Sequence, residues 1–226
     1  STTVAFANEA GAREKQDVGL NGLSTADEFL FEYNGAKPYA DYVSALKGKV
    51  DPTVLALWEN DEFSPLNDPA GDNYHYYRGN AYDDAETPIL VRYKRYNGTE
   101  GNSPEMQESA SYGTASTLQP DIEDINQDNT LNDSERFYRY RISIRKEDWQ
   151  RVGQQHIASI METKVTLRNK ETALVKWYQF KIPLRGDTAM MKKVGNIRNF
   201  KSIRFARIYM TNFSQETHLR LASLDL

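Results

Sequence analysis

The sequence has no cysteine, only three histidines and no long apolar run, and each lack excludes a kind of site or structure. Without cysteine the chain forms neither a disulfide nor a thiolate metal or catalytic centre. No apolar stretch approaches the ~18 residues that a membrane-spanning helix needs. Basic residues are not gathered into a block or stripe, so the sequence shows no nucleic-acid footprint.

Enzyme motifs are missing as well. No glycine-rich phosphate loop follows a strand pattern, and neither a His-Glu-x-x-His motif nor a nucleophile elbow occurs. The histidines His75, His156 and His218 are far apart in sequence, and we expect packing or surface roles for them. Acid pairs such as Asp83-Asp84 and Glu147-Asp148 would serve a glycosidase only at the required separation. The sequence therefore predicts a non-catalytic protein.

What is present is the composition of a soluble folded domain. Of the 226 residues, 39% are hydrophobic and 27% are charged, and 28 basic and 32 acidic residues give a net charge of −4. Tyrosine occurs 14 times, beside nine Phe and three Trp, which favours an aromatic-rich β core. The chain starts at Ser1 without a visible signal peptide, and we expect it to be a segment of a longer protein.

Residues 1–110 carry short helical signals separated by Gly, Pro and Asn. The segments 24–35, 38–48, 51–60 and 87–98 each begin with a capping residue or a proline, and most end at Gly or Asn-Gly. The last of these also fits a strand, because its apolar residues alternate, but we favour a helix. We expect this part to consist of short helices and loops that pack on a β domain.

Residues 111–226 show strand alternation instead. The predicted strands are 136–145, 162–171, 173–184, 200–213 and 218–226. They predict an α+β, mainly β fold, with a jelly-roll-like β-sandwich in this half. The expected inner residues are Tyr138, Tyr140, Ile142, Ile144, Tyr178, Phe180, Ile182, Ile203 and Phe205, and the expected outer ones are Arg139, Arg141, Lys181 and Arg204. Outer-membrane barrels alternate similarly, but recurrent Arg and Lys along the strands favour the sandwich.

The segment 124–135, DINQDNTLNDSE, has the spacing of an EF-hand calcium loop. Such a loop needs oxygen ligands at positions 1, 3 and 5, a carbonyl at 7, often a water at 9 and a bidentate acid at 12. The residues at these positions are Asp124, Asn126, Asp128, Thr130, Asn132 and Glu135. Asn129 takes the left-handed position 6 and Leu131 the apolar anchor position. We predict a Ca²⁺ site here, and a solvated acidic loop is the alternative.

A second segment, 17–28, repeats the pattern less completely. Asp17, Asn21 and Glu28 fall at positions 1, 5 and 12, but Gly19 offers no side-chain ligand at position 3. These three residues are a weaker calcium candidate. A capped helix start explains the same residues.

Several phrases together resemble one family. They are EKQDVGLNGLS, GDNYHYYRG, RYKRYNGTEGNSP, PDIEDINQDNTLNDSERFYRYRISI, VKWYQFKIPL and NFKSIRFARIYMTNF. In this order they resemble blocks of the SprA/Sov proteins, which act in gliding motility and the type IX secretion system of Bacteroidetes. The resemblance implies a segment of a protein-secretion translocon in the outer membrane, exposed on its extracellular or periplasmic side. It also implies partner outer-membrane proteins and secreted cargo proteins.

Two functions follow as hypotheses. The first is a non-catalytic structural or interaction segment of the translocon, stabilised by calcium, with no membrane span and no nucleic-acid partner of its own. The second is a carbohydrate-binding jelly-roll module of a cell-surface protein, since such folds host lectins. Exposure of Trp58, Trp149 and Trp177 on one face would favour the second hypothesis.

Overall fold

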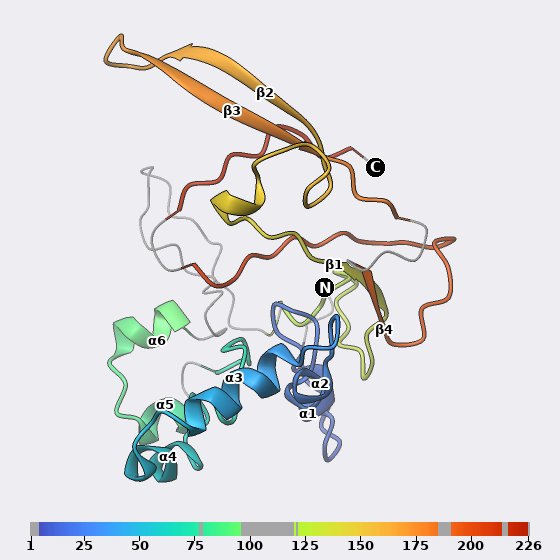
Figure 1. Ribbon diagram of the computed structural model, residues 1–226. Coiled ribbons are helices and arrows are strands. Elements are labelled where there is room, and N and C mark those ends of the chain that lie inside the picture. The colour runs from blue at the N-terminus through green and yellow to red at the C-terminus, as the bar shows by residue number, and fades with distance from the viewer. Residues whose placement is uncertain are drawn as a thin grey trace. The chain divides into compact units, whose positions relative to one another are not determined.

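The elements of the chain are short, and helices precede strands. The computed structural model describes residues 5–76, 79–95, 120, 122–184, 191–213 and 217–225. The described elements are α1 (Arg13–Gln16), α2 (Thr25–Leu30), α3 (Pro38–Lys47), α4 (Pro52–Trp58), α5 (Asn80–Asp84), α6 (Ile89–Arg95), β1 (Phe137–Tyr140), a 3₁₀ turn (Lys146–Asp148), β2 (Ile157–Thr166), β3 (Thr172–Phe180) and β4 (Met191–Val194) (Figure 1).

The chain divides into two units. The first unit comprises Ser1–Phe31, Lys37–Asp133 and Phe200–Leu226, and the second comprises Glu32–Ala36 and Ser134–Asn199. The buried apolar residues of the first unit are Ala12, Val18, Leu23, Val43, Tyr74, Tyr82, Ile125 and Leu131. Most of these lie on loops rather than on helices, so loop packing positions the candidate site described below.

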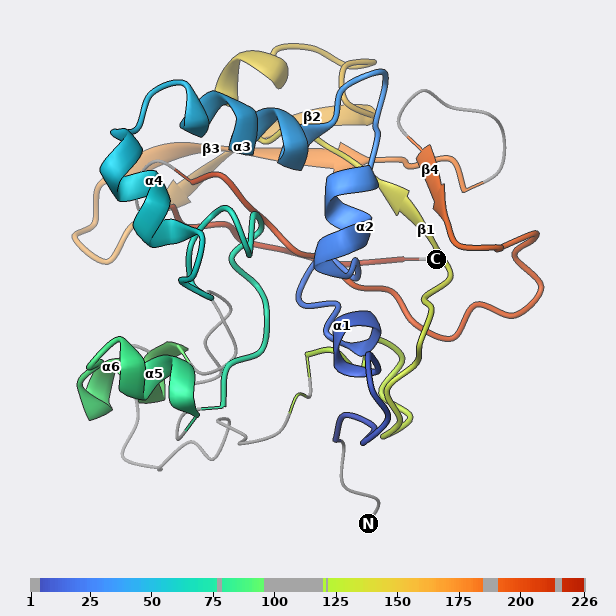
Figure 2. The same ribbon diagram turned by 90° about the horizontal axis from the view of Figure 1, so that it is seen from below.

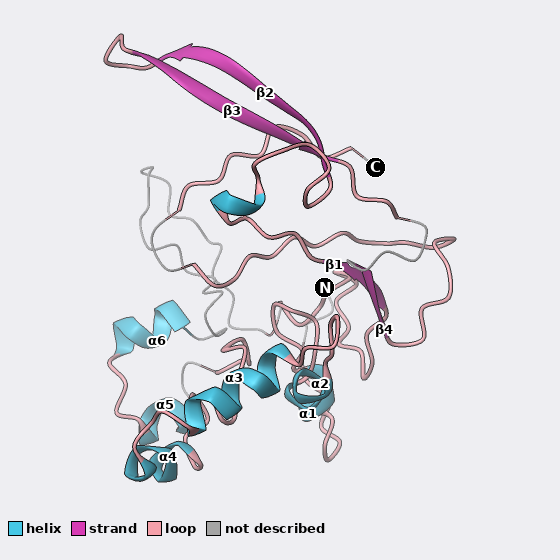
Figure 3. Cartoon of the chain, viewed as in Figure 1, coloured by secondary structure: helices cyan, strands magenta, loops and turns pink. Residues whose placement is uncertain are grey.

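The helices begin where the sequence provides caps. Ser24 Oγ accepts a hydrogen bond from Asp27 N–H (3.2 Å) at the start of α2, and Asp51 Oδ1 accepts one from Thr53 N–H (2.8 Å) before α4. Pro38 is the first residue of α3. The predicted helices within 38–48, 51–60 and 87–98 are confirmed (Figure 3). The helices α1 and α5, only four and five residues long, were not predicted.

The helix predicted over 24–35 ends earlier than expected. It stops at Leu30, and Asn34-Gly35 does not cap it. These two residues have φ of 51° and 77° and form a tight turn in which Tyr33 and Ala36 exchange backbone hydrogen bonds of 2.8 and 3.0 Å. Asn-Gly therefore acts here as a hairpin turn. α2 packs against α3, the next helix along the chain (Figure 2).

The strands form two separate antiparallel sheets, β1 with β4 and β2 with β3. In the β2–β3 hairpin, Ile157 lies opposite Phe180 and Thr166 lies opposite Thr172. Lys170 in the connecting loop has a φ of 67°, so the predicted Asn-Lys turn is confirmed. Figure 1 shows the hairpin as the longest pair of strands.

The described residues show an α+β fold with two small sheets but not the predicted β-sandwich or jelly roll. Strands occur in the predicted segments 136–145, 162–171 and 173–184. Within the described residues of 200–213 and 218–226 there is no strand, and β4 was not predicted. The predicted domain boundary at residues 110 and 111 lies outside the described residues.

The predicted inner face needs correction. None of its nine residues is fully buried, and Ile144, Ile182 and Ile203 are 38%, 36% and 50% exposed. Arg139, predicted to face outward, is buried, and its guanidinium lies 5.5 Å from the centre of the Phe137 ring. The reason is that a two-stranded sheet has no second layer of its own to cover an apolar face.

Within the described ranges, no helix has both the length and the apolar character needed to cross a bilayer.

Candidate metal centre

Loop 17–28 connects α1 to α2 and places Glu28 inside the first unit. Gly19 and Gly22 have φ of 53° and 74°, a left-handed conformation that glycine adopts without steric cost. Ser24 then caps α2, and Glu28 lies at the fourth residue of the helix. The Glu28 side chain is only 1% exposed, although glutamate is among the residues least often buried.

Loop 64–73 contributes two further buried carboxylates. Asp68 accepts backbone hydrogen bonds of 2.8 to 3.2 Å from three residues that follow it, Gly71, Asp72 and Asn73. Asp72 Oδ2 accepts hydrogen bonds from the N–H groups of Leu20 (3.0 Å) and Asn21 (3.1 Å). The first set fixes the turn around Asp68, and the second joins this loop to loop 17–28.

Glu28, Asp68 and Asp72 form one acidic cluster. Each offers a carboxylate oxygen, and these oxygens all lie within 4.8 Å of one another. Ca²⁺ binds oxygen at about 2.3–2.6 Å, so two ligands on opposite sides of the ion are roughly 4.6–5.2 Å apart. The spacing of the cluster therefore fits three ligands of a single ion.

The electrostatics of this cluster are unfavourable without a cation. Burial, followed by the charge of Asp72, raises the pKa of Glu28 far above its usual range, against a hydrogen bond from Asn21. Burial also raises the pKa of Asp68, although its three backbone hydrogen bonds oppose the shift. Like charges in a buried site disfavour ionisation, and a bound cation would remove that penalty.

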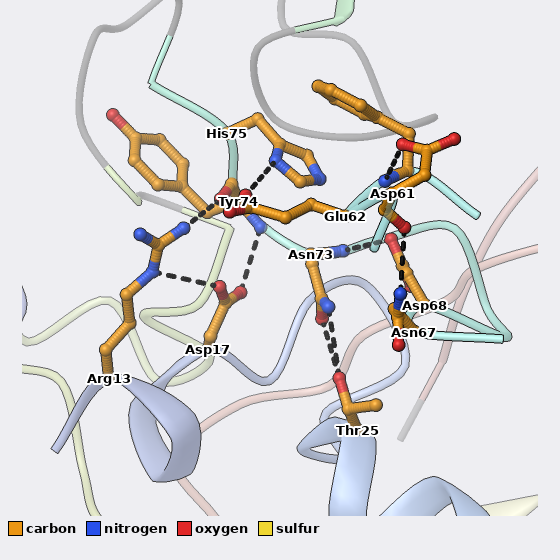
Figure 4. Close-up of polar contacts among 11 residues, drawn as sticks. Arg13, Asp17, Thr25, Asp61, Glu62, Asn67, Asp68, Asn73, Tyr74 and His75 are labelled. Atoms are coloured by element: carbon orange, nitrogen blue, oxygen red, sulfur yellow. Dashed lines mark hydrogen bonds and ion pairs between the residues drawn. The ribbon is translucent and has the colours of Figure 1, made fainter. Parts of the chain in front are cut away.

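Asp17, predicted as a ligand, lies beside the cluster rather than in it. Its Oδ1 accepts a hydrogen bond from Tyr74 N–H (2.9 Å), and its Oδ2 is 3.7 Å from Arg13 Nε (Figure 4). Burial raises the pKa of Asp17 to about 7, against the effects of Tyr74 N–H and Arg13. Figure 4 also shows Thr25 and Asn73 bonded to each other (3.0 and 3.1 Å), a second link between the two loops.

Asn21, the other predicted ligand of this loop, orients Glu28. Its amide nitrogen donates to Glu28 Oε1 and to the Tyr39 hydroxyl (3.2 Å). Its Oδ1 accepts from Leu23 N–H (2.7 Å). Of the three residues predicted from loop 17–28, the structure thus brings Glu28 into the acidic cluster and places Asn21 and Asp17 around it.

The loop 124–135 is closed by its own backbone. Asp124, which is buried, accepts hydrogen bonds from the N–H groups of Asp128 (3.1 Å) and Asn129 (2.8 Å). Asn129 has a φ of 64°, as predicted for position 6, and Leu131 is buried, as predicted for the anchor. Asp128 in turn accepts from Thr130 N–H (3.0 Å). The loop has a defined shape, but calcium binding by it stays a prediction.

The last predicted ligand of that loop belongs to another part of the molecule. The first unit includes Asp133, and Ser134 begins the second unit, so Glu135 is separated by this boundary from Asp124, Asn126, Asp128, Thr130 and Asn132. Asp133 itself accepts a hydrogen bond from Gln16 Nε2 (2.8 Å). This contact ties the end of the loop to α1.

Arg207 links the surroundings of both loops. Its guanidinium donates to the carbonyls of Gly19 (3.2 Å) and Leu20 (3.3 Å), and to that of Ile122 (2.7 Å). One side chain from the C-terminal extended segment thus satisfies carbonyls beside each loop.

His75 packs as an aromatic residue. Its ring lies 4.2 Å from that of Phe63 and 6.0 Å from that of Tyr82 (centroid distances). Burial, then the charge of Arg13, lowers the pKa of His75 to about 4, so the ring is neutral at pH 7. The 3.9 Å contact between its Nδ1 and Glu62 is therefore not an ion pair at that pH (Figure 4).

Two members of the acidic cluster were missed from the sequence. Asp68 and Asp72 lie in NDPAGDNY, for which no metal ligand was predicted. The signal that would have found them is the spacing of two acids across a Pro-Ala-Gly turn, which brings both side chains to one side. Their pairing with Glu28, some 40 residues earlier, is tertiary and leaves no local pattern.

Comparison with known protein families gives the class of protein to which the chain belongs. Residues 41–226 match a family described as motility related/secretion protein. That family is SprA_N, and because the match spans most of the chain, the chain belongs to it. The predicted resemblance to SprA/Sov proteins is thereby confirmed. Comparisons with curated proteins and with solved structures gave no match.

Proposed function

We propose that this chain is a non-catalytic structural and interaction segment of an outer-membrane protein-secretion translocon. Its partners are other parts of the translocon and partner outer-membrane proteins, and the secreted cargo passes by it. The motility and secretion family supports this role at the level of the system. The observation that carries the role of an interaction segment is the β2–β3 hairpin.

The two faces of the hairpin differ in polarity. Cross-strand register places Met161 opposite Trp177 and Val165 opposite Ala173, with Val175 between them on the same face. The other face carries the exposed ion pair Glu162–Lys176 (2.7 Å) and Lys164, together with the apolar residues Ile160, Leu174 and Tyr178. Met161 is 64% exposed, and no residue of this apolar face is fully buried. The face of Met161, Val175 and Trp177 carries no charged residue in either strand, so it is the face suited to packing on another protein surface.

In this proposal, strands from neighbouring parts of the translocon add to or cover the β2–β3 hairpin. An isolated two-stranded hairpin is marginally stable in water, and a third strand or a covering layer stabilises it. The jelly-roll-like sandwich would then form when neighbouring parts of the translocon cover the apolar face.

Calcium has a structural part in the proposal. Loop 124–135 would bind Ca²⁺ as a clasp in front of β1, neutralising its carboxylates and fixing the start of the strand. The buried Leu131 and the closed turn around Asp124 support a loop that is shaped before an ion arrives.

Carbohydrate binding is not favoured by a specific observation, because Trp58, Trp149 and Trp177 are all half-buried rather than exposed. Trp149 packs on Tyr178 and Phe180, with ring centroids 4.8 and 5.1 Å apart, so its ring already has aromatic partners. A stacking platform for sugar needs a free aromatic face. We therefore keep the interaction role as the single proposal.

The test is a charge introduced on the apolar face in cells that depend on the translocon. Met161→Asp combined with Val175→Asp should reduce secretion and motility strongly at unchanged protein level, because a charge in a packed interface is costly. The matched control is Thr166→Asp with Leu174→Asp on the face of the Glu162–Lys176 pair, which adds the same charge, leaves that ion pair in place and should have a small effect. Normal secretion with the apolar-face variant would contradict the proposal.

A further inference from the structure

The acidic cluster of Glu28, Asp68 and Asp72 is not needed for the interaction role. We infer that this cluster is a calcium site assembled from loop 17–28 and loop 64–73, separate from loop 124–135. The inference does not depend on the secretion role.

The first support is geometric. Three carboxylate oxygens, one from Glu28 and two from the distant loop 64–73, lie within 4.8 Å of one another. Carboxyl groups this close in a buried site ionise together only when a cation offsets their repulsion, and otherwise one of them keeps its proton. Among the described residues, the ion pairs include neither Glu28 nor Asp68.

The second support is an unsatisfied oxygen on the most buried of the three. Glu28 is 1% exposed, and its Oε2 makes no hydrogen bond of good geometry among the described residues, although the Ala70 backbone N–H approaches the carboxylate. Its other oxygen is held by Asn21, which fixes the direction of the carboxylate. A buried polar atom without a partner carries a full desolvation penalty, and an ion bound in the cluster would satisfy it.

The third support is the rigidity of the surroundings. Asp68 and Asp72 are held by backbone N–H groups, so both carboxylates are in place before an ion binds. Gly19 allows Asp72 to approach, since an added Cβ would lie only 2.5 Å from Asp72 Cγ. Arg207 donates to the carbonyl of Gly19 and holds the loop from the opposite side of the peptide chain. Preorganised ligands are what a tight ion site requires.

The chemistry of the ligands selects the ion. The cluster contains carboxylate oxygens and no histidine or cysteine, which disfavours Zn²⁺. Mg²⁺ demands near-ideal octahedral geometry and keeps several waters, whereas Ca²⁺ accepts irregular cages of protein oxygens. Ca²⁺ is therefore the expected ion, and binding would cross-link the start of α2 to loop 64–73.

The experiment is a Ca²⁺ titration by calorimetry on the chelator-treated 226-residue chain. The wild-type chain should bind Ca²⁺ at this cluster, with a second event only if loop 124–135 also binds. Asp68→Asn and Glu28→Gln should each weaken the cluster event by at least about 10-fold, because each removes a ligand charge. Asp84→Asn, an exposed acid in α5, should change nothing, and Asp124→Asn should leave the cluster event intact.

A second measurement covers variants that fail to fold. Tb³⁺ replaces Ca²⁺ and emits when a nearby tyrosine is excited. The Tyr39 hydroxyl is 3.2 Å from Asn21 Nδ2, beside the cluster. Tyr39→Phe should therefore lower the Tb³⁺ emission while Ca²⁺ still binds. The inference is overturned if the wild-type chain binds no Ca²⁺ up to about 10 mM, well above the weakest extracellular sites. It is also overturned if binding is unchanged in both ligand variants or if emission is unchanged in Tyr39→Phe.

Discussion

Loops 17–28 and 124–135 follow the same twelve-residue pattern, but they fold into different environments. Loop 124–135 matches the pattern better, yet its first ligand residue, Asp124, accepts hydrogen bonds from the backbone of the loop itself. Loop 17–28 matches worse, yet its Glu28 meets two acids from a distant loop. A spacing pattern counts only local ligands, so it undervalues a site that is completed by another segment.

The two loops also differ in how many of their acidic residues are buried. In loop 17–28 the acids Asp17 and Glu28 are both buried, and so are Asp68 and Asp72 beside them. In loop 124–135 Asp124 is buried, but Asp128 and Asp133 are exposed. An ion therefore has more repulsion to relieve at the first loop, and changes there should have the larger effects.

The largest effect is expected from a steric change at Gly19. Gly19→Ala places a Cβ 2.5 Å from Asp72 Cγ on a backbone with φ of 53°. The clash adds to the left-handed penalty, so we expect a loss of about 3 kcal/mol or more in unfolding free energy. Gly35→Ala is the control, since Gly35 also has positive φ but nothing within 4 Å, and should lose about 1–2 kcal/mol. If urea unfolding gives equal losses of free energy for Gly19→Ala and Gly35→Ala, the close approach of Asp72 to Gly19 does not contribute to stability.

Protonation of the buried His75 should make the unfolding free energy of the chain depend on pH. The folded pKa of about 4 lies below the unfolded value of 6.5, so the unfolded chain binds the proton more readily between these values. The stability that neutral His75 contributes is complete above pH 6.5 and is lost as pH falls towards 4. The loss amounts to about 3 kcal/mol.

His75→Phe keeps the packing against Phe63 and removes the proton site. The difference in unfolding free energy between wild type and this variant should therefore change by about 3 kcal/mol between pH 7 and pH 4. The groups around the ring, Arg13, Asp61 and Glu62, are retained in both proteins and cancel in the difference. A pH-independent difference would show that His75 is not buried as described.

Glu28→Gln should have opposite effects with and without calcium. In metal-free buffer at pH 7 the raised pKa keeps Glu28 protonated in the folded chain, whereas the unfolded chain ionises it. Glu28→Gln removes the cost of holding that proton, so its unfolding free energy should rise by about 2 kcal/mol. With saturating calcium the wild type gains about 2.7 kcal/mol at 100-fold excess over its dissociation constant, and the variant should gain little. Thermal unfolding with chelator and with calcium measures both. Parallel gains in the two proteins would place the ion elsewhere.

The smallest effect is expected at the other loop. Asp124→Asn weakens the hydrogen bonds to Asp128 and Asn129 and should cost about 1 kcal/mol in metal-free buffer. If loop 124–135 also binds calcium, the cost should grow when calcium is added. If Asp124→Asn loses the same unfolding free energy with and without calcium, loop 124–135 does not bind the ion, and only loop 17–28 is expected to depend on calcium.

Local signals in the sequence predicted the local structure well. Caps and prolines located α2, α3, α4 and α6, because the first turn of a helix is set by residues within it. The turn around Lys170 and the left-handed Asn129 were also predictable, since both depend on one or two residues. Asn34-Gly35 was interpreted as a helix stop because Asn-Gly occurs both at helix C-termini and in hairpin turns. The backbone pairing of Tyr33 with Ala36 shows that it forms a hairpin turn here.

Long-range structure was not predictable in the same way. Strand alternation at 200–213 gave a plausible strand, but its Arg207 instead holds carbonyls near residues 20 and 122. The apolar faces were assigned to a sandwich because alternation states which residues share a face but not what covers that face. Asp68 and Asp72 escaped notice for the same reason, as their partner Glu28 is distant in sequence.

The most direct measurement of the central claim is an experimental structure of the chain determined with about 10 mM calcium, well above the weakest extracellular dissociation constants. The account predicts a Ca²⁺ ion bound by Glu28, Asp68 and Asp72 at about 2.3–2.6 Å, with Asn21 still bonded to Glu28. A calcium ion at loop 124–135 with none between these three carboxylates would contradict it.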